Sequence, residues 1–437
     1  MSEHGYFFKR WIMGALVFSL FSVYGVVLGL TRSHAEWSYV VQQVVIPLLV
    51  VGMVSVVTSW MFRGKAMGAG LAYLRGALIY GLFFSIALTS LLGLTQTMTG
   101  SHAVSTNALF YGLSFYSLFL AYHLAVAGRI QSQGVWVATN PLILITGPIS
   151  VFFSSLSHRS FRKRLYYYAP FVLIGVFFFK VVASPLSYFH DMLKLTDAVS
   201  ALLYAFIFEL FVYFNFAGLS LLVYGLFGIM GVKIPLNFRQ PFSARNLVEF
   251  WRGWHVSLSA VLKELFYNPV KRRVGSYLAV FAVFLSSAIW HGVSLNFLLW
   301  GILHASLFAL TMYMLKARKY WVTPFIMVFG ILFGRLLFAD ANTDRLLEKL
   351  SLSLAESYDE LKGFFDYIPD YVLTGLVLAV VMVLVEFFML RNRYVRKRNY
   401  RHLRSPWAQA VLAALVVTFF VVFDTSTLQE FAVYSQR

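Results

Sequence analysis

Long apolar runs recur along most of this chain, and they constrain its fold more than any other feature. Each run is near the ~20 residues that an α-helix needs to cross a bilayer. Hydrophobic residues make up 59% of the 437 residues and charged residues only 12%, against about a quarter in ordinary soluble domains. Because hydrocarbon offers no hydrogen-bond partners, backbone inside a membrane must form helices or closed barrels. The predicted spans are 11–30, 39–62, 68–94, 105–127, 166–186, 197–230, 275–294, 296–316, 321–338, 371–390 and 407–425.

The sequence therefore predicts an all-α polytopic membrane protein of about 11 transmembrane helices, forming a single domain over 1–437. The stretches 132–156 and 240–268 are apolar or amphipathic without being clean spans, and we expect re-entrant or interfacial pieces there. The run 11–30 follows two basic residues, as the core of a signal peptide does, but it exceeds the usual ~7–15 residues. We expect it to be a retained first span.

Basic residues are concentrated in short tracts between the apolar runs. Cytoplasmic loops of membrane proteins carry an excess of Lys and Arg, so the net charge of +18 is interpreted as a topology signal rather than as nucleic-acid binding. All tracts fall on one side of the membrane if 132–156 and 240–268 do not cross it. The N-terminus is then cytoplasmic and the C-terminus extracytoplasmic. The tracts are Lys9/Arg10, Arg63/Lys65, Arg129, Arg159/Arg162/Lys163/Arg164, Lys271/Arg272/Arg273, Lys316/Arg318/Lys319 and Arg391 to Arg404.

Two charged segments have a plain and a functional interpretation. The segment 339–370 holds eight of the 18 acidic residues and falls on the extracytoplasmic side of the membrane. It is either a solvated loop or a docking face for an extracytoplasmic partner. The tract from Arg391 to Arg404 either binds anionic lipid headgroups or docks an acidic donor such as an acyl carrier protein.

The chain contains no cysteine. This excludes disulfides, a thiol nucleophile and cysteine-ligated metals. No His-Glu-x-x-His motif is present, and His255, His291 and His304 lack ligand spacing on one helix face, so we expect no metal. Gly-rich phosphate loops are absent as well, and no tightly bound cofactor is expected.

Polar and aromatic motifs are concentrated between Asn237 and His304. A segment Asn-Phe-Arg-Gln-Pro-Phe-Ser begins at Asn237, and Trp254-His255 is followed by Ser-Leu-Ser. Trp290-His291-Gly then lies in an apolar run, and His304 in the next one. Ionisable groups at membrane depth are costly and are functional by default.

A helix is predicted over 243–268, with Ser243 as its N-cap. The spacing places Arg245, Glu249 and Arg252 on one face and Trp254 with His255 on the other. Such an amphipathic helix is expected at the cytoplasmic interface.

This order of motifs resembles the signature of the membrane-bound O-acyltransferase family. A helix ending in aromatics and Arg335, together with the last span, is similar to the alginate O-acetyltransferase branch, and a D-alanyl-teichoic acid transferase is the near alternative. The resemblance implies a fold with a central tunnel. It implies that an acyl group passes from a cytoplasmic thioester to a hydroxyl at the outer side.

The resemblance also implies the site residues. His291 is expected to be the catalytic base, because imidazole accepts a proton near neutral pH. His255 is expected either to be a second essential group or to position the donor, and His304 to pack. The residues expected along the substrate and donor tunnel are Trp254, Trp290, Ser257, Asn237, Arg239, Glu209 and Asn215.

The chain departs from the family pattern at two places. Asn215 stands where the family usually has aspartate, and Lys263-Glu264 where it often has arginine-aspartate. An amide holds no charge, so Glu209 either takes over the electrostatic role of that aspartate or is paired inside the helix bundle.

The expected donor is acetyl-CoA or an acyl carrier protein, and the expected acceptor is a cell-envelope polysaccharide or an extracytoplasmic, hydrolase-like partner protein. Acetyl is the first expectation and D-alanyl the second. A polar-core transporter or lipid scrambler, and a catalytically inactive scaffold, stay open as different classes. We expect the protein in the inner (cytoplasmic) membrane, among membrane lipids.

Overall fold

The computed structural model describes residues 121–122, 125–126, 155–189, 198–292, 294–339, 368–389 and 399–423. Three predicted spans and nearly all of a fourth lie outside these residues: 11–30, 39–62, 68–94 and 105–127. The predicted re-entrant piece 132–156 and the acidic segment 339–370 also lie almost entirely outside them. The chain divides into two compact units, each described by itself.

The first unit holds a small antiparallel sheet. Strand β1 (Ser155–Leu156) pairs with β2 (Val232–Lys233). The start of α8 (Phe161–Val176) and the end of α11 (Ala198–Met230) belong to the same unit. There Arg164 Nε donates a hydrogen bond to the Ile229 carbonyl at 2.9 Å, which ties the start of α8 to the last turn of α11.

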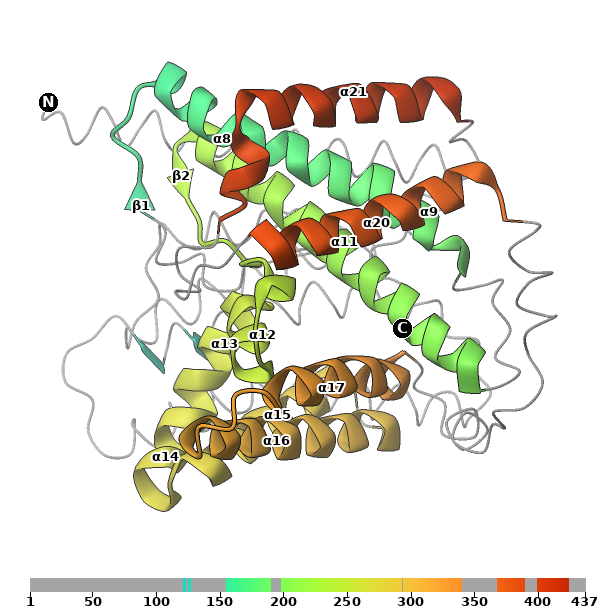
Figure 1. The fold of residues 1–437 in the computed structure, drawn as a ribbon. Coiled ribbons are helices and arrows are strands. Elements are labelled where there is room, and N and C mark those ends of the chain that lie inside the picture. Colours follow the sequence, from blue (N-terminus) through green and yellow to red (C-terminus); the bar gives the residue numbers. More distant parts are fainter. Residues whose placement is uncertain are drawn as a thin grey trace, which may run out of the picture. The chain divides into compact units, whose positions relative to one another are not determined.

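The second unit holds the longer helices. In it α8 continues through the π-helical η3 (Phe177–Ala183) into α9 (Ser184–Leu186). The C-terminal part of α8 lies against α11 at two glycines, since a Cβ on Gly175 would approach the Gly218 carbonyl oxygen to 2.8 Å. The remaining long helices are α15 (Ser276–His291), α16 (Leu295–Lys316), α17 (Thr323–Phe338), α20 (Asp370–Met389) and α21 (Pro406–Val422) (Figure 1).

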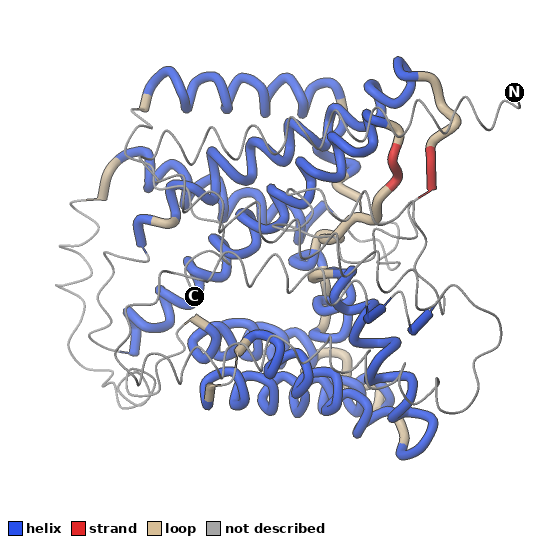
Figure 2. Tube along the Cα trace, turned by 180° about the vertical axis from the view of Figure 1, so that it is seen from behind, coloured by secondary structure: helices blue, strands red, loops and turns tan. Residues whose placement is uncertain are grey.

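Helices account for nearly all of the described residues (Figure 2). The seven predicted spans from 166–186 onward each coincide with a helix. Four helices of the described part are long and apolar enough to cross a membrane: Phe161–Leu186, Ala198–Met230, Leu295–Lys316 and Asp370–Phe388. The prediction of a helical membrane protein is confirmed at this level.

The segment 240–268 differs from its prediction. It is a series of short helical pieces, so the prediction of a single amphipathic helix over 243–268 is wrong. The N-cap prediction is wrong too, because Ser243 Oγ donates to the Gln240 carbonyl at 2.7 Å, and Asn246 Oδ1 caps α12 by accepting from Glu249 N at 2.9 Å. The pieces are η4 (Pro241–Ser243), α12 (Leu247–Gly253), α13 (Val256–Leu262), η5 (Lys263–Tyr267) and α14 (Asn268–Val274).

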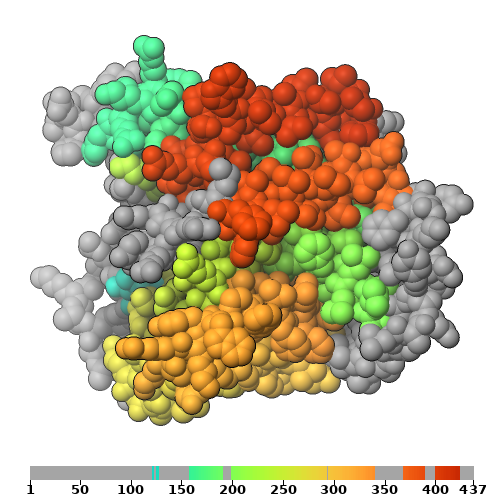
Figure 3. Space-filling model, viewed as in Figure 1, coloured from blue at the N-terminus to red at the C-terminus, as the bar shows by residue number. Residues whose placement is uncertain are grey.

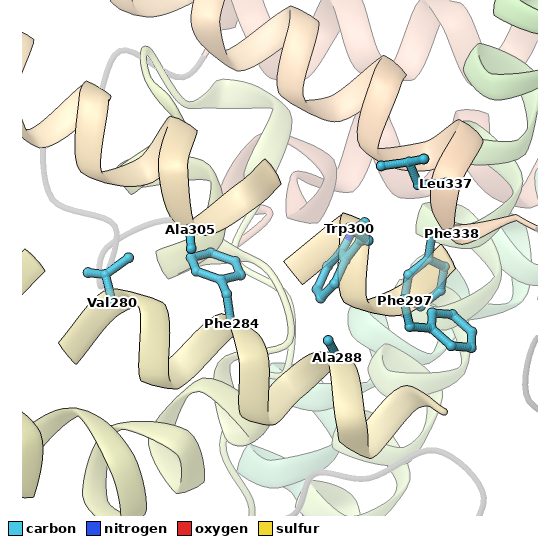
Figure 4. Close-up of a cluster of buried hydrophobic side chains, with 8 residues drawn as sticks. All are labelled: Val280, Phe284, Ala288, Phe297, Trp300, Ala305, Leu337 and Phe338. Carbon is cyan, nitrogen blue, oxygen red and sulfur yellow. The ribbon is translucent and has the colours of Figure 1, made fainter. Parts of the chain in front are cut away.

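A hydrophobic cluster joins α15, α16 and α17 (Figure 4). Gly301 allows α16 to approach α15 closely, because a Cβ at that position would come within 2.9 Å of the Ala288 side chain and 3.0 Å of the Phe284 carbonyl oxygen. At the other end of the cluster the rings of Phe297 and Phe338 meet edge to face at 5.2 Å. The cluster comprises Val280, Phe284, Ala288, Phe297, Trp300, Ala305, Leu337 and Phe338.

Within the second unit, the basic ends of α14, α16 and η7 (Arg401–Arg404) lie on one side, at the left of Figure 1. Two highly exposed tryptophans, Trp321 (74%) and Trp407 (84%), follow these basic residues closely in the sequence. Tryptophan is enriched at membrane–water interfaces. Helices α20 and α21 lie at the surface (Figure 3) and expose large apolar side chains, as lipid-facing helices do.

Candidate active site

His255 lies at a sharp break between α12 and α13. Its φ of 41° is in the left-handed region, which is uncommon for residues other than glycine. The imidazole caps α13, because Nδ1 accepts a hydrogen bond from Leu258 N at 3.3 Å. In the neutral ring this assigns the proton to Nε2. The backbone conformation of His255 therefore explains why the predicted continuous helix is interrupted.

Asn237 holds this break in place. Its Oδ1 accepts hydrogen bonds from the hydroxyl of Ser257 at 2.7 Å and from the backbone N–H of Ser257 at 3.2 Å. Its carbonyl accepts from Val256 N at 2.8 Å, and its Nδ2 donates to Ser220 Oγ on α11 at 3.3 Å. Asn237 and Ser257, both predicted site residues, therefore form one buried network around His255.

Arg239 continues the segment that Asn237 begins. Its backbone N–H donates to the Gly253 carbonyl at 2.8 Å, and a Cβ on Gly253 would lie 3.1 Å from the Arg239 carbonyl oxygen. The end of α12 therefore packs directly on this segment.

His255 is buried among aromatic rings. The ring of Phe216 is 4.8 Å from the imidazole and that of Trp290 is 6.4 Å away, both edge to face. His255 lies outside the membrane-spanning helices, and burial lowers its pKa to about 3. The imidazole is therefore neutral throughout the physiological pH range.

His291 is the last residue of α15 and is half-buried. Its nearest rings are Trp290 at 4.6 Å, Phe338 at 4.7 Å and Trp300 at 5.7 Å, measured between centroids. Gly292 follows with a φ of 157°, and a Cβ there would lie 2.7 Å from the Phe297 ring. The glycine of the Trp-His-Gly motif therefore lets the chain turn beneath Phe297 next to His291.

Trp290 contacts both histidines. Its ring centroid is 4.6 Å from that of His291 and 6.4 Å from that of His255. The structure thus brings His255 together with Trp290 and His291, which follow it by 35 and 36 positions in the sequence. All three are predicted site residues.

Glu209 on α11 forms an ion pair with Arg335 on α17. Arg335 Nε also donates a hydrogen bond to Glu209 Oε2 at 2.5 Å. Both side chains are nearly buried, with exposed fractions of 4% and 10%. Pairing inside the bundle, one of the two expectations for Glu209, is found. Arg335 was not predicted as a site residue, although an arginine in an apolar helix is itself the signal.

Asn215 is buried in α11. Its neighbour Phe216 packs against His255 at 4.8 Å, so this turn of α11 borders the site. Trp254, beside His255 in the sequence, packs on Phe238 at 5.1 Å and on Phe250 at 5.4 Å.

His304 lies one aromatic ring away from His291. It is buried in α16, with Trp300 and Trp251 each at 5.0 Å and Phe284 stacked at 5.8 Å. This is the environment of a packing residue in the core.

A second buried polar network was not predicted. The Tyr213 hydroxyl on α11 donates to Glu386 Oε1 on α20 and lies 3.2 Å from the Tyr400 hydroxyl. Tyr400 N donates to Gln240 Oε1 at 2.8 Å. Burial, followed by the nearby Glu386 carboxylate, raises the pKa of Tyr400 well above its usual value. The network links the end of the basic tract to the segment that carries Asn237 and Arg239.

Within the described ranges, no three His, Asp or Glu side chains are grouped so that they could hold a metal ion.

Comparison with known proteins gives matches across this region. A model of the membrane-bound O-acyltransferase family matches residues 143–336. A peptidoglycan O-acetyltransferase of Helicobacter pylori is 25% identical over 309 residues, which are 64% of this chain and 57% of the relative. A teichoic acid D-alanyltransferase of Bacillus subtilis is 32% identical over 24% of this chain and 30% of its own length.

A probable alginate O-acetylase of Pseudomonas syringae is 29% identical over 206 residues, which are 43% of this chain and 38% of that protein. The matched part therefore spans between about a third and somewhat over half the length of these curated relatives.

Proposed function

A model of the membrane-bound O-acyltransferase family matches residues 143–336 of this chain, and we propose that the chain is a member that moves an acyl group, acetyl foremost, from a cytoplasmic thioester to a hydroxyl outside the membrane. The acceptor is a polysaccharide of the cell envelope or a partner protein that passes the group on. The peptidoglycan, alginate and teichoic acid transferases among its relatives support this class of acceptor. They also favour a transferase over a transporter or scrambler.

The observation that carries the proposal is the arrangement of His255 and His291 around Trp290. His291 is half-buried at a helix end, whereas His255 is buried and caps α13. A base must reach the proton that it removes. His291 has the access that this role needs, and His255 has the rigid setting of a group that positions the donor.

In the reaction, a ring nitrogen of His291 takes the proton of the acceptor hydroxyl as its oxygen attacks the thioester carbonyl carbon. A carbon–oxygen bond forms, the carbon–sulfur bond breaks, and the thiolate leaves with the proton returned from the imidazolium. The acyl group passes along a central tunnel bordered by Trp254, Trp290 and Asn237. Asn237, Ser257 and Arg239 keep the His255 turn rigid through the hydrogen bonds described above.

The donor reaches the site from the cytoplasm as acetyl-CoA or on an acyl carrier protein, and no tightly bound cofactor is required. The exposed basic residues of α14 lie on the side of the unit that carries the basic helix ends, which suits an anionic donor. The same distribution supports a cytoplasmic N-terminus, an extracytoplasmic C-terminus and a place in the inner membrane. An extracytoplasmic, hydrolase-like partner is expected to receive the acyl group.

D-alanyl transfer from a carrier protein is the second candidate. It is favoured by the 32% identity to the teichoic acid D-alanyltransferase of Bacillus subtilis, although this match covers only 24% of the chain. The match to the peptidoglycan O-acetyltransferase covers 64% of the chain, and we therefore place acetyl first.

A transfer assay separates the two candidates. The full chain in lipid vesicles is supplied either with [¹⁴C]acetyl-CoA or with a D-[¹⁴C]alanyl carrier protein, together with a cell-envelope extract as acceptor. Label that moves from acetyl-CoA into polymer or protein supports the proposal, and label that moves only from the D-alanyl carrier supports the second candidate. If neither label moves while the protein stays folded, the acyltransferase proposal is wrong.

A further inference from the structure

Arg335 touches the aromatic neighbours of both histidines. Its guanidinium carbon lies 5.2 Å from the centre of the Phe338 ring and 5.8 Å from that of Trp254. Phe338 packs edge to face against His291 at 4.7 Å, and Trp254 directly precedes His255. The Arg335 guanidinium therefore contacts one ring that packs on His291 and one ring that directly precedes His255 in the sequence.

Glu209 determines where this cation lies. It comes from α11, accepts from Arg335, and is nearly fully buried. A buried ion pair gives little net stability, because desolvation of both charges offsets their attraction. Its forked geometry, however, restricts where the guanidinium can lie. The pair is therefore better suited to positioning neighbouring groups than to stabilising the fold.

We propose that Glu209 and Arg335 are positioning residues that set Phe338 and Trp254, and through these rings His291 and His255, in their arrangement for acyl transfer. The inference rests on the proposed function of this site. Neither residue touches the reacting atoms in this account. Arg335 acts through the two rings, and Glu209 acts through Arg335.

The test compares three variants with wild type in the acetyl transfer assay: Arg335→Lys, Glu209→Gln, and the double variant Glu209→Gln/Arg335→Met. Arg164→Lys is the matched control, because Arg164 is also half-buried over an aromatic ring, that of Phe161 at 5.9 Å, and belongs to the first unit. Arg335→Lys keeps the charge and removes the fork. We expect its kcat to fall ~10–100-fold with the donor KM within about twofold, since a small misplacement of catalytic groups can cost about 100-fold.

Glu209→Gln leaves Arg335 without the carboxylate that fixes its position, so its kcat should fall while the donor KM stays within about twofold of wild type. The double variant should lose no more kcat than Glu209→Gln alone, because Glu209 acts through Arg335. A merely structural role would lower the unfolding temperature without this split between kcat and KM. Arg164→Lys should match wild type in both kcat and donor KM.

Several outcomes would overturn the inference. These are wild-type kcat in Arg335→Lys or in Glu209→Gln, a raised donor KM in place of a lowered kcat, or an equal loss of kcat in Arg164→Lys. If Arg335→Lys does not fold, Phe338→Leu replaces it, since this change removes the ring beside His291 without touching a charge. Wild-type kcat in Phe338→Leu would then reject the positioning role. An inactive wild-type protein would instead reject the proposed function.

Discussion

The Oδ1 atom of Asn237 accepts both the hydroxyl and the backbone N–H of Ser257, at 2.7 and 3.2 Å. These two bonds hold the first turn of α13 against the segment that precedes α12. His255 is the N-cap of α13, two positions before Ser257. The geometry of His255 therefore depends on an amide 18 positions earlier (255 − 237).

Asn237→Ala should destabilise the protein and impair transfer together. Leaving the buried Ser257 donors without their acceptor costs about 1–3 kcal/mol, and the His255 turn loosens as a result. Asn237→Asp, which keeps the acceptor oxygens, should retain more activity than the alanine variant. Thermal unfolding and acyl transfer of the two purified variants check this, and equal behaviour of both would contradict the role of the acceptor.

His255→Asn separates the backbone role of His255 from its imidazole. Asparagine tolerates the left-handed conformation and is a strong N-cap residue, so α13 should keep its start. We expect near wild-type stability at neutral pH together with a raised apparent KM for the donor. His255→Ala, which loses both roles, should unfold at a lower temperature. A wild-type donor KM in His255→Asn would show that the imidazole does not position the donor.

The low pKa of His255 also predicts how stability depends on pH. The unfolded chain takes up a proton at His255 below ~6.5, whereas the folded protein does so only near a pKa of about 3. Folding keeps His255 neutral, and the stability linked to this is therefore complete above pH ~6.5 and is lost progressively as the pH falls toward 3. At pH 5 the loss amounts to about 2 kcal/mol. Denaturant unfolding between pH 7 and 5 should show a weaker pH dependence in His255→Asn than in wild type, and parallel curves would contradict this.

The sequence alone predicted the helices that carry the site, because apolar runs near 20 residues leave few alternatives in a bilayer. It did not predict the break at His255, since a left-handed histidine has no local sequence signal comparable to glycine. Arg335 as the partner of Glu209, and the pairing of Tyr213 with Glu386, were missed for another reason. These partners lie 126 and 173 positions apart, and only helix packing brings them together.

Charge reversal on the donor side should weaken donor binding. Arg245, Arg252 and the three basic residues of α14 are exposed, so an anionic donor can meet them before it reaches the site. Arg252→Glu or Arg272→Glu should raise the KM for the donor more than it lowers kcat, the pattern of lost uniform binding. Lys319→Glu, an exposed basic residue after α16, is the control and should leave KM unchanged. A collapsed kcat at constant KM would assign Arg252 or Arg272 to the fold or the chemistry instead.

The topology can be tested with single cysteines, since the chain has none of its own. Lys397→Cys is expected on the cytoplasmic side and Glu356→Cys on the outer side, in accordance with the positive-inside rule. An impermeant thiol reagent applied to intact cells should label position 356 only. Labelling of 397 but not of 356 would reverse the orientation.

The most direct test of the account is acyl transfer by His291→Gln. Glutamine keeps hydrogen-bonding capacity but cannot accept and release a proton, and general-base help is typically worth ~10²–10⁴-fold. Transfer by the purified variant in lipid should fall by at least about 100-fold, while thermal unfolding and donor binding stay near wild type. His158→Gln, at an exposed position, should transfer normally. A stably folded His291→Gln protein with near-normal turnover would contradict the assignment of His291 as the base.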